Sequence, residues 1–328
     1  MANGRPLPVS TLAGCHMDRL TENKIMLIVR QTRLDELIAR YNTLAQAQFY
    51  VEHLGADFSD YLNEDQQYKK SVATAEEGLR ALGRVQVLQR AFLPNFLFGK
   101  DDLIVVLGQD GLVANTLKYL NDQLVIGVNP DPRRWDGVLL PFSVRDLDEV
   151  VREVFAKGRK ISNVTMAKAE LNDGQSLYAV NDLFIGAKTH VSARYRISLG
   201  DVEENHSSSG IIVSTGLGST GWLKSVLTGA AGIASALTKK NLSVARKETV
   251  SWDAEYLYFS VREPFPSKIT STSMIFGKIT TSTPMTLTSG MPENGVIFSD
   301  GIENDYLAFN SGMKATIKVA DKSGHLVV

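Results

Sequence analysis

Short apolar runs alternate with segments of helical periodicity over the first half of the chain. Residues 85–88 indicate a further strand, and the apolar runs, which are rich in aliphatic residues, lie at 25–29, 103–107 and 124–128. Such runs predict strands that are buried on both faces, as in a parallel sheet. Between them, apolar residues recur at helical spacing after Thr32, over residues 112–120 and over residues 142–155. This alternation predicts an α/β, doubly wound nucleotide-binding domain, which we assign to residues 23–158.

The pattern changes beyond residue 158, where shorter strand-like runs follow one another. These runs lie at 161–166, 177–185, 195–199, 210–213, 257–261, 285–287, 296–298 and 315–319. Turn-forming sequences separate them, as at residues 172–174 and 321–324. One helix is expected to begin near Leu223. The second half is therefore predicted to be a mostly antiparallel, β-rich domain over residues 159–328.

Composition narrows the classes of protein to which this chain can belong. It has 328 residues, of which 44% are hydrophobic and 22% charged, with a net charge of -1. This balance gives no reason to expect nucleic acid or a membrane surface as a partner. No apolar run approaches the roughly 20 residues that span a bilayer. The single cysteine excludes an internal disulfide framework and is typical of a reducing compartment, so we expect a cytoplasmic location.

Residues 1–22 precede the first predicted strand and are expected to form a mobile leader. Cys15 follows Leu12-Ala13-Gly14, which is similar to a lipoprotein cleavage box. The residues before it lack the apolar run that a signal peptide requires, so we do not expect a lipid anchor.

The sequence Gly108-Gln109-Asp110-Gly111 directly follows the apolar run at 103–107. A glycine-rich turn between a strand and a helix presents free backbone N–H groups and the positive end of the helix dipole. We therefore expect Gly108, Gln109 and Gly111 to bind phosphate. Asp110 would lie among the phosphates, where its carboxylate could take the proton from a substrate hydroxyl near a metal ion. An ordinary glycine turn, with no catalytic role for Asp110, accounts for the same four residues.

The next apolar run, at 124–128, is followed by two more polar candidates, Asn129 and Arg133. Ligands of doubly wound sheets lie beyond the carboxyl ends of the strands. Asn129 is therefore expected to contact a ligand and Arg133 to contact phosphate, although arginines in such loops are usually solvated.

Two stretches of the second half carry further candidates. Asn181 and Asp182 interrupt an apolar run, and their amide and carboxylate can pair with a base edge and with ribose or amine donors. A polar pair at a β-bulge or strand edge is the alternative interpretation. Residues 214–222 form a loop of glycines and hydroxyl residues in which Ser219 and Thr220 can contact phosphate or ribose, and Trp222 can stack on a base. A purely structural glycine-rich loop would show the same pattern.

Taken in this order, these stretches resemble the ATP-dependent NAD kinase family. The Gly-Gly-Asp-Gly motif of that family corresponds to residues 108–111, and its Asn-Glu pair corresponds to residues 181–182. Its Ser-Thr-Pro-Thr-Gly-Ser-Thr-Ala-Tyr loop corresponds to residues 214–222. The likeness extends to residues 126–129 and 298–301. The chain departs from the family pattern at Gln109, Leu112 and Ser209, where the family has a glycine, a threonine and often an aspartate. Within the loop, Gly216-Leu217 replaces Pro-Thr and Trp222 replaces tyrosine.

The resemblance implies ATP-dependent phosphorylation of the adenosine-ribose 2′-hydroxyl of NAD, with Asp110 as the general base. It implies ATP and Mg²⁺ as cofactors, with no metal ion fixed by the protein alone, and a homodimer or homotetramer. It also implies that the β-rich domain binds the substrate and that the C-terminal tail returns to the first domain. The residues implied to bind NAD are Asn129, Asn181, Asp182, Ser219, Thr220, Gly221 and Trp222.

Two other functions fit the same scaffold. One is a kinase that acts on another hydroxyl, of a sugar, nucleoside or lipid, and it is favoured by Gln109 and Ser209. The other is a dinucleotide-binding protein without catalysis, against which the presence of Asp110 argues.

Overall fold

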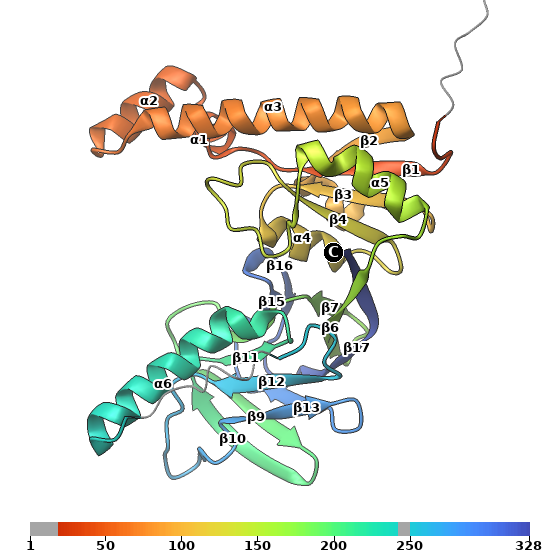
Figure 1. The fold of residues 1–328 in the computed structure, drawn as a ribbon. Coiled ribbons are helices and arrows are strands. Elements are labelled where there is room, and N and C mark those ends of the chain that lie inside the picture. The colour runs from red at the N-terminus through yellow and green to blue at the C-terminus, as the bar shows by residue number, and fades with distance from the viewer. Residues whose placement is uncertain (1–18, 242–249) are drawn as a thin grey trace, which may run out of the picture.

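The computed structural model describes residues 19–241 and 250–328 (Figure 1). Most of the expected leader, residues 1–18, lies outside the described residues. An eleven-stranded sheet and a six-stranded sheet form the framework of the described chain. No helix within the described ranges is long and apolar enough to cross a membrane.

The first half supplies five parallel strands to one side of the eleven-stranded sheet. In spatial order they are β2 (Arg84–Gln89), β1 (Lys24–Val29), β3 (Leu103–Leu107), β4 (Leu124–Asn129) and β5 (Phe142–Ser143). Their residues are almost all buried in β1, β3 and β4, as expected for strands that are covered on both faces. The order 2-1-3-4-5 is that of a doubly wound sheet.

Helices cover both faces of these parallel strands. The helices are α1 (Arg33–Tyr41), α2 (Leu44–His53), α3 (Phe58–Leu82), α4 (Asp110–Leu117) and α5 (Leu147–Phe155), with short 3₁₀ turns at η1 (Arg90–Asn95) and η2 (Val144–Asp146). Leu79 of α3 and Val151 of α5 pack with Leu27 on one face, whereas Val113 of α4 packs with Ile28 on the other. Figure 1 shows α3 and α5 above the sheet and α4 below it. The doubly wound prediction is thereby confirmed.

Capping residues set where two of these helices begin. Thr32 and Asp35 form a reciprocal capping box at the start of α1, the helix that the pattern after Thr32 predicts. Ser143 forms the same motif with Asp146, but there it begins the 3₁₀ turn η2, and α5 starts only at Leu147.

The second half is β-rich, as predicted, with antiparallel pairing between its own strands. Six strands extend the large sheet: β6 (Ile161–Leu171), β7 (Ser176–Ala179), β9 (Ala193–Leu199), β10 (Val202–Ser208), β14 (Met285–Ser289) and β17 (Lys314–Val327). The six-stranded sheet has the order β13 (Phe276–Thr280), β12 (Tyr256–Val261), β11 (Ile211–Ser214), β8 (Asp182–Ala187), β15 (Gly295–Ser299) and β16 (Ile302–Ala308). The two sheets bury a shared core that includes Ile185, Val213, Ile197 and Leu287. The strands β10, β13 and β16 lack continuous apolar runs, so the pattern did not reveal them.

Strand β17 joins the two halves of the molecule. It pairs with β6 and β14, and its last residues pair in parallel with β4, where Leu326 lies opposite Val125. The expected turn at residues 321–324 is wrong, because this segment lies inside β17 and produces a register shift between Val319 and Ser323. The irregularity lets one strand serve both the antiparallel and the parallel part of the sheet.

Gly127 in β4 permits a close approach by the chain that follows this strand. A Cβ atom at this position would lie 1.9 Å from the carbonyl oxygen of Leu139, a contact that no side chain allows. The segment around Leu139 therefore rests directly on the backbone of β4.

Gly127→Ala is expected to force this segment away from β4 and to lower the free energy of unfolding by about 1–3 kcal/mol or more. Gly78→Ala is the matched control, since Gly78 lies on the exposed face of α3 and an added Cβ there would have no atom within 4 Å. It should raise stability by about 0.5–1 kcal/mol through helix propensity. Urea denaturation of both variants measures these changes, and an unaffected Gly127→Ala would contradict the close contact.

Candidate functional site

Asp110 is the first residue of α4, directly after the carboxyl end of β3. Its Oδ1 accepts a hydrogen bond from the Leu139 N–H at 2.8 Å, and its Oδ2 accepts one from the Val138 N–H at 3.3 Å. These two bonds hold the carboxylate in one orientation at the positive end of the helix, where a negative charge is favoured. Asp110 is therefore a fixed, partly accessible carboxylate beside the glycine-rich turn.

Asn129 shapes the loop that holds Asp110. Its side chain is buried, with Oδ1 accepting from the Asp131 N–H at 3.0 Å and Nδ2 donating to the Trp135 carbonyl at 2.9 Å. Gly137, which has a φ of 66°, lies so close that a Cβ there would be 2.8 Å from Asn129 Nδ2. The amide thus stabilises the return of the chain towards Asp110, and its expected contact with NAD stays a prediction.

Arg133 extends into solvent from the same loop. Its side chain is 89% exposed, and its Nε lies 3.7 Å from a carboxylate oxygen of Asp131. Nothing in the described residues directs it towards the turn at 108–111, so its role in phosphate binding also stays a prediction.

A network of ion pairs surrounds the carboxyl end of β1. Glu64 of α3 pairs with both Arg30 and Arg33 at 2.7 Å, and Asp60 pairs with Arg33 and Arg134. The bonds from Arg134 and Arg33 hold the pKa of Asp60 well below its usual range. These arginines are neutralised by acids of α3, so they tie α3 to the loops after β1 and β4.

Asp300 organises the backbone around Asn181 and Asp182. It forms a two-residue turn with Gly301 between β15 and β16, in which both residues have positive φ angles of 55° and 72°. Its carboxylate accepts hydrogen bonds from the N–H groups of Val180, Asn181 and Asp182, the shortest being 2.7 Å. Burial raises the pKa of Asp300, while these N–H groups favour its ionised form.

Sequence reasoning missed this role of Asp300, although residues 298–301 contributed to the family resemblance. A usable signal was present, because Asp300-Gly301 stands between two strands and is typical of a tight hairpin. The target of the carboxylate could not be read in this way, since Val180 is 120 residues away in the sequence.

Asp182 has a buried carboxylate oxygen that lacks a hydrogen-bond donor. Its Oδ1 is inaccessible to water and has no hydrogen-bond partner among the described residues. Burial raises the pKa of Asp182 to about 7, a bond from Ser214 lowers it, and the nearby Asp300 carboxylate raises it further. A buried acceptor without a donor is costly, so a ligand that supplies a hydroxyl or amine hydrogen would be stabilised here.

The glycine-rich loop packs directly against this pair. Thr215 Oγ1 donates to the Val180 carbonyl at 2.6 Å, and the Thr215 N–H donates to the Asn181 carbonyl at 2.9 Å. A Cβ at Gly218 would lie 2.2 Å from the Asn181 carbonyl oxygen, which explains the glycine there. Gly218 begins the 3₁₀ turn η3 (Gly218–Thr220).

The hydroxyl groups of the loop donate inwards rather than towards solvent. Ser219 Oγ bonds to the Gly216 carbonyl at 2.7 Å, and Thr220 Oγ1 bonds to the Leu217 carbonyl at 3.4 Å. Each oxygen keeps lone pairs that can accept from a ribose hydroxyl.

Trp222 begins the helix α6 (Trp222–Thr238), just after Gly221. Its ring stacks on Phe184 with centroids 5.9 Å apart, and the guanidinium of Arg262 lies 5.5 Å from the ring centre. A pocket of about 180 Å³ beside Trp222 is lined by these residues and by others that include Lys188 and Phe298. Trp222 thus forms part of an aromatic wall of a small pocket, and its stacking on a base stays a prediction.

The two groups of candidate residues share one apolar core. Leu112 and Val113 lie in the first turn of the helix that begins with Asp110, whereas Val180 precedes the Asn181–Asp182 pair and Leu217 lies in the glycine-rich loop. All four side chains belong to the same buried cluster. The structure therefore brings the turn at 108–111 and the candidate residues of the second half to one region of the molecule.

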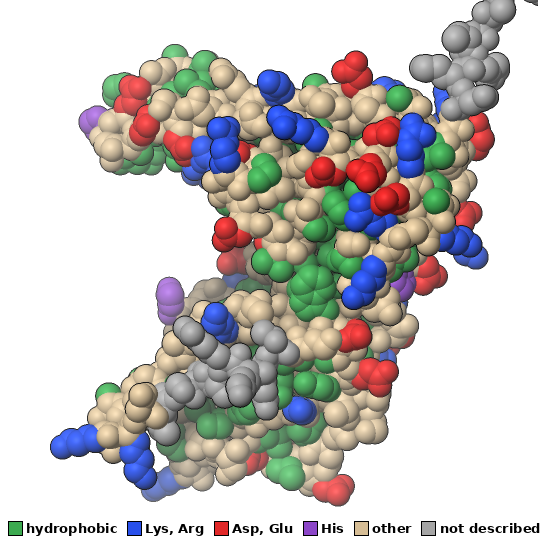
Figure 2. Space-filling model, viewed as in Figure 1, with side chains coloured by type: hydrophobic (Ala, Val, Ile, Leu, Met, Phe, Trp, Pro, Cys, Tyr) green, Lys and Arg blue, Asp and Glu red, His purple; other side chains and the backbone are tan. Residues whose placement is uncertain are grey.

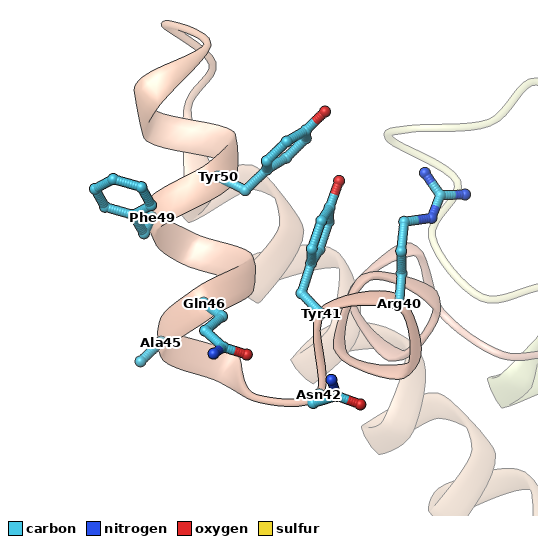
Figure 3. A pocket seen from close by; sticks show the side chains of 7 residues that line it. All are labelled: Arg40, Tyr41, Asn42, Ala45, Gln46, Phe49 and Tyr50. Atoms are coloured by element: carbon cyan, nitrogen blue, oxygen red, sulfur yellow. The ribbon is translucent and has the colours of Figure 1, made fainter.

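A second pocket lies away from this region, on the arm formed by α1 and α2 (Figure 3). Tyr41 and Tyr50 stand side by side there with ring centroids 4.4 Å apart, and Phe49 is 70% exposed. Figure 2 shows the surface hollowed between this arm and the part of the molecule that carries α6. The residues expected to bind phosphate or NAD do not line the pocket on the arm.

Comparisons with known proteins point to one family. No protein-family model matches the chain. It is similar to NAD kinase 2 of Geobacillus kaustophilus, with 27% identity over 129 residues, which are 38% of this chain and 48% of that protein. It is also similar to the NAD kinase of Heliobacterium modesticaldum, with 34% identity over 129 residues, 37% of this chain and 44% of that protein. The matches thus span just under half the length of these curated relatives.

Two solved structures share the fold over nearly the whole chain. One is an NAD kinase from Archaeoglobus fulgidus in complex with ATP, with a TM-score of 0.57, 14% identity, and coverage of 93% of both chains. The other is a yeast NADH kinase complexed with NADH, with a TM-score of 0.58, 14% identity, and coverage of 94% of this chain and 84% of that one.

A parallel sheet joined to a β-rich half is the fold that this chain shares with these NAD and NADH kinases. The shared fold and the sequence matches over 129 residues bear out the resemblance to the NAD kinase family that the sequence motifs indicated.

Asp182→Asn is expected to change how stability depends on pH. The raised pKa of Asp182 means that the folded protein binds a proton between about pH 4 and pH 7 that the unfolded chain does not, so the native state loses stability as pH rises. Asparagine does not titrate, so the variant should not lose this stability. As the pH is raised from 5 to 8, its free energy of unfolding should therefore increase by about 2–3 kcal/mol relative to that of the native protein.

Denaturation at both pH values measures this gain. Asp173→Asn is the control, because Asp173 is exposed and its pKa is lowered by bonds from Gln175. A gain of the same size in both variants, or in neither, would contradict the burial of an uncompensated Asp182 carboxylate.

Proposed function

We propose that the protein is an ATP-dependent NAD kinase that phosphorylates the 2′-hydroxyl of the adenosine ribose. The observation that carries the proposal is the arrangement of Asp110, held by two N–H groups at the start of α4, on the same apolar core as a buried Asp182 oxygen without a donor. The names of the relatives support the reaction, since they are NAD and NADH kinases.

The phosphates of ATP would bind at the turn formed by Gly108, Gln109 and Gly111. Gly111 is exposed and has no atom near the position of a Cβ, so a phosphate can approach the first N–H groups of α4. Asp110 would take the proton of the ribose hydroxyl while the hydroxyl oxygen forms a bond to the γ-phosphorus and the bond to the ADP oxygen breaks. Because Asp110 is already oriented by Val138 and Leu139, little reorganisation is needed.

The residues present fit a magnesium ion that arrives with ATP. Mg²⁺ commonly binds to substrate phosphates with one or two protein carboxylates and several waters. Asp110 would be the carboxylate nearest to such an ion, and no group of three or more acidic, histidine or cysteine side chains in the described residues forms a cage for it. When bound, the ion would neutralise the charge of the phosphates.

The adenosine part of NAD would bind at the second group of residues. The Asp182 side chain would turn towards the ligand, so that Oδ1 gains a donor from a ribose hydroxyl or the adenine amino group, and Asn181 would pair with the base edge. Ser219, Thr220 and Gly221 would line the ribose, while Trp222 would contact a ring. We also propose, on the family resemblance and the single cysteine, a cytoplasmic homodimer or homotetramer.

One observation favours the second candidate, a kinase of another hydroxyl compound. Ser209 stands where the family often has an aspartate. Its hydroxyl donates a hydrogen bond to Glu263, so this position offers a ligand no carboxylate of its own. The acceptor could therefore differ while the Asp110 chemistry is the same.

Asp110→Asn tests the proposal directly. The variant keeps an oxygen that can accept from Leu139 but cannot take a proton, so turnover is expected to fall by about 10²–10⁴-fold. The assay supplies NAD, ATP and Mg²⁺ and detects NADP through an NADP-specific dehydrogenase. Asp148→Asn, an exposed acid in the first turn of α5, should retain native turnover.

The native protein's result separates the candidates. NADP formation that depends on Asp110 supports the proposal. Binding of NAD without NADP formation, together with ADP release in the presence of a sugar, nucleoside or lipid, favours the second candidate.

Gln109→Gly tests the glutamine in the phosphate turn. Gln109 precedes α4 without forming a side-chain cap, so its removal should free space near the phosphates at little cost to the helix. We expect the KM for ATP to fall about three- to tenfold, which corresponds to roughly 0.7–1.4 kcal/mol. An unchanged or higher KM would show that the glutamine is accommodated or contributes to binding.

A further inference from the structure

Lys118 follows the last residue of α4 and is buried, with only 2% of its side chain exposed. Its Nζ lies 2.8 Å from Asp305 Oδ2 and 3.2 Å from Ser299 Oγ. A buried ammonium group is costly unless it is paired and hydrogen-bonded. The position of Lys118 is therefore coupled to the hairpin of β15 and β16, which carries both partners.

Two further side chains form hydrogen bonds near the same end of the helix. Tyr119 Oη donates to Asp305 Oδ2 at 2.7 Å, and burial together with the Asp305 carboxylate raises the pKa of Tyr119, so its hydroxyl stays protonated. Lys322 of β17 donates to the carbonyls of Lys118 and Leu120, at 2.9 and 2.7 Å. Carbonyl groups at the C-terminal end of a helix lack donors within the helix, and Lys322 supplies a donor there.

The hairpin that receives Lys118 also holds the candidate NAD-binding backbone. Asp300 lies in the turn of this hairpin and accepts hydrogen bonds from the N–H groups of residues 180–182. The positive charge of Lys118 favours the ionised form of Asp300. At the other end of α4, eight helical residues or about 12 Å away, is Asp110. One rigid helix thus connects the candidate base to the support of the Asn181–Asp182 pair.

Resting on the proposed function, we propose that Lys118 and Asp305 are positioning residues of the phosphoryl-transfer site. Their buried ion pair sets where the helix that begins with Asp110 lies relative to the Asp300 turn, and hence relative to bound dinucleotide. Neither residue touches the reacting atoms. Phosphoryl transfer between two bound substrates requires their relative positions to be correct to within about 1 Å. Each substrate can still bind to its own half of the site when this relative position is changed.

Lys118→Met and Asp305→Asn test this inference in the full-length protein. We expect kcat for NADP formation to fall at least tenfold in both. The Kd for ATP with Mg²⁺ and the Kd for NAD, each measured alone by calorimetry, should change less than threefold. Lys118→Met should remain folded, because methionine fills similar volume and Asp305, whose side chain is 37% exposed, can be hydrated. Asp305→Asn should unfold at a lower temperature than Lys118→Met, because it leaves the buried ammonium without its counter-charge.

Tyr119→Phe is the matched control. It removes the neighbouring hydrogen bond to Asp305 but keeps the ion pair, so kcat should stay within threefold of the native value. A kcat within twofold of native in Lys118→Met overturns the inference. A loss of kcat that is matched by an equal loss of NAD affinity also overturns it, since it would show a role in the stability of the NAD site alone.

A native protein that forms no NADP would contradict the proposed function, and the inference is then decided by binding alone. The affinity for NAD is measured with and without ATP and Mg²⁺, in the native protein and in Lys118→Met. The inference is supported if ATP and Mg²⁺ change the affinity for NAD at least threefold in the native protein and not in Lys118→Met. The inference is overturned if Lys118→Met shows the same effect of ATP and Mg²⁺ on NAD affinity, or if the native protein shows no such effect.

Discussion

Three backbone N–H groups at the break between β7 and β8 donate to a single buried carboxylate, that of Asp300. Buried N–H groups must find acceptors, and here the strand ladder is interrupted where Val180 and Asn181 leave it. The acceptor comes from a hairpin turn more than a hundred residues later. This arrangement allows Val180 and Asn181 to leave regular pairing without loss of hydrogen bonds, and the glycine-rich loop then packs on the carbonyl groups of these two residues.

The same principle governs the first half of the site. The Asp110 carboxylate satisfies two N–H groups of the loop after β4, and that loop is shaped by the buried amide of Asn129. Glycine at position 127 lets the loop lie against the strand. A side chain held in this way is preorganised for chemistry, because it loses little freedom when substrate arrives.

Several buried polar side chains near the candidate site thus bond to the backbone. The sequence predicts ligand contacts for Asn129 and for the hydroxyl residues of the loop at 214–222, yet Asn129 and Thr215 both bond to backbone groups. The direction of such a side chain could not be known from the sequence, since a group that can bond to ribose can equally bond to a carbonyl group.

The sequence by itself determined the doubly wound first half, the β-rich second half and the three stretches that carry the candidate chemistry. These depend on local patterns: aliphatic runs such as 103–107, the Thr32 cap, and the glycines at 108 and 111. Only the tertiary structure decided that β17 crosses between the halves, that 321–324 bends a strand instead of ending it, and that Lys118 reaches Asp305. The reason is physical, because these features depend on pairings between residues far apart in the chain. The pattern within any short window stays the same whichever distant partner is chosen.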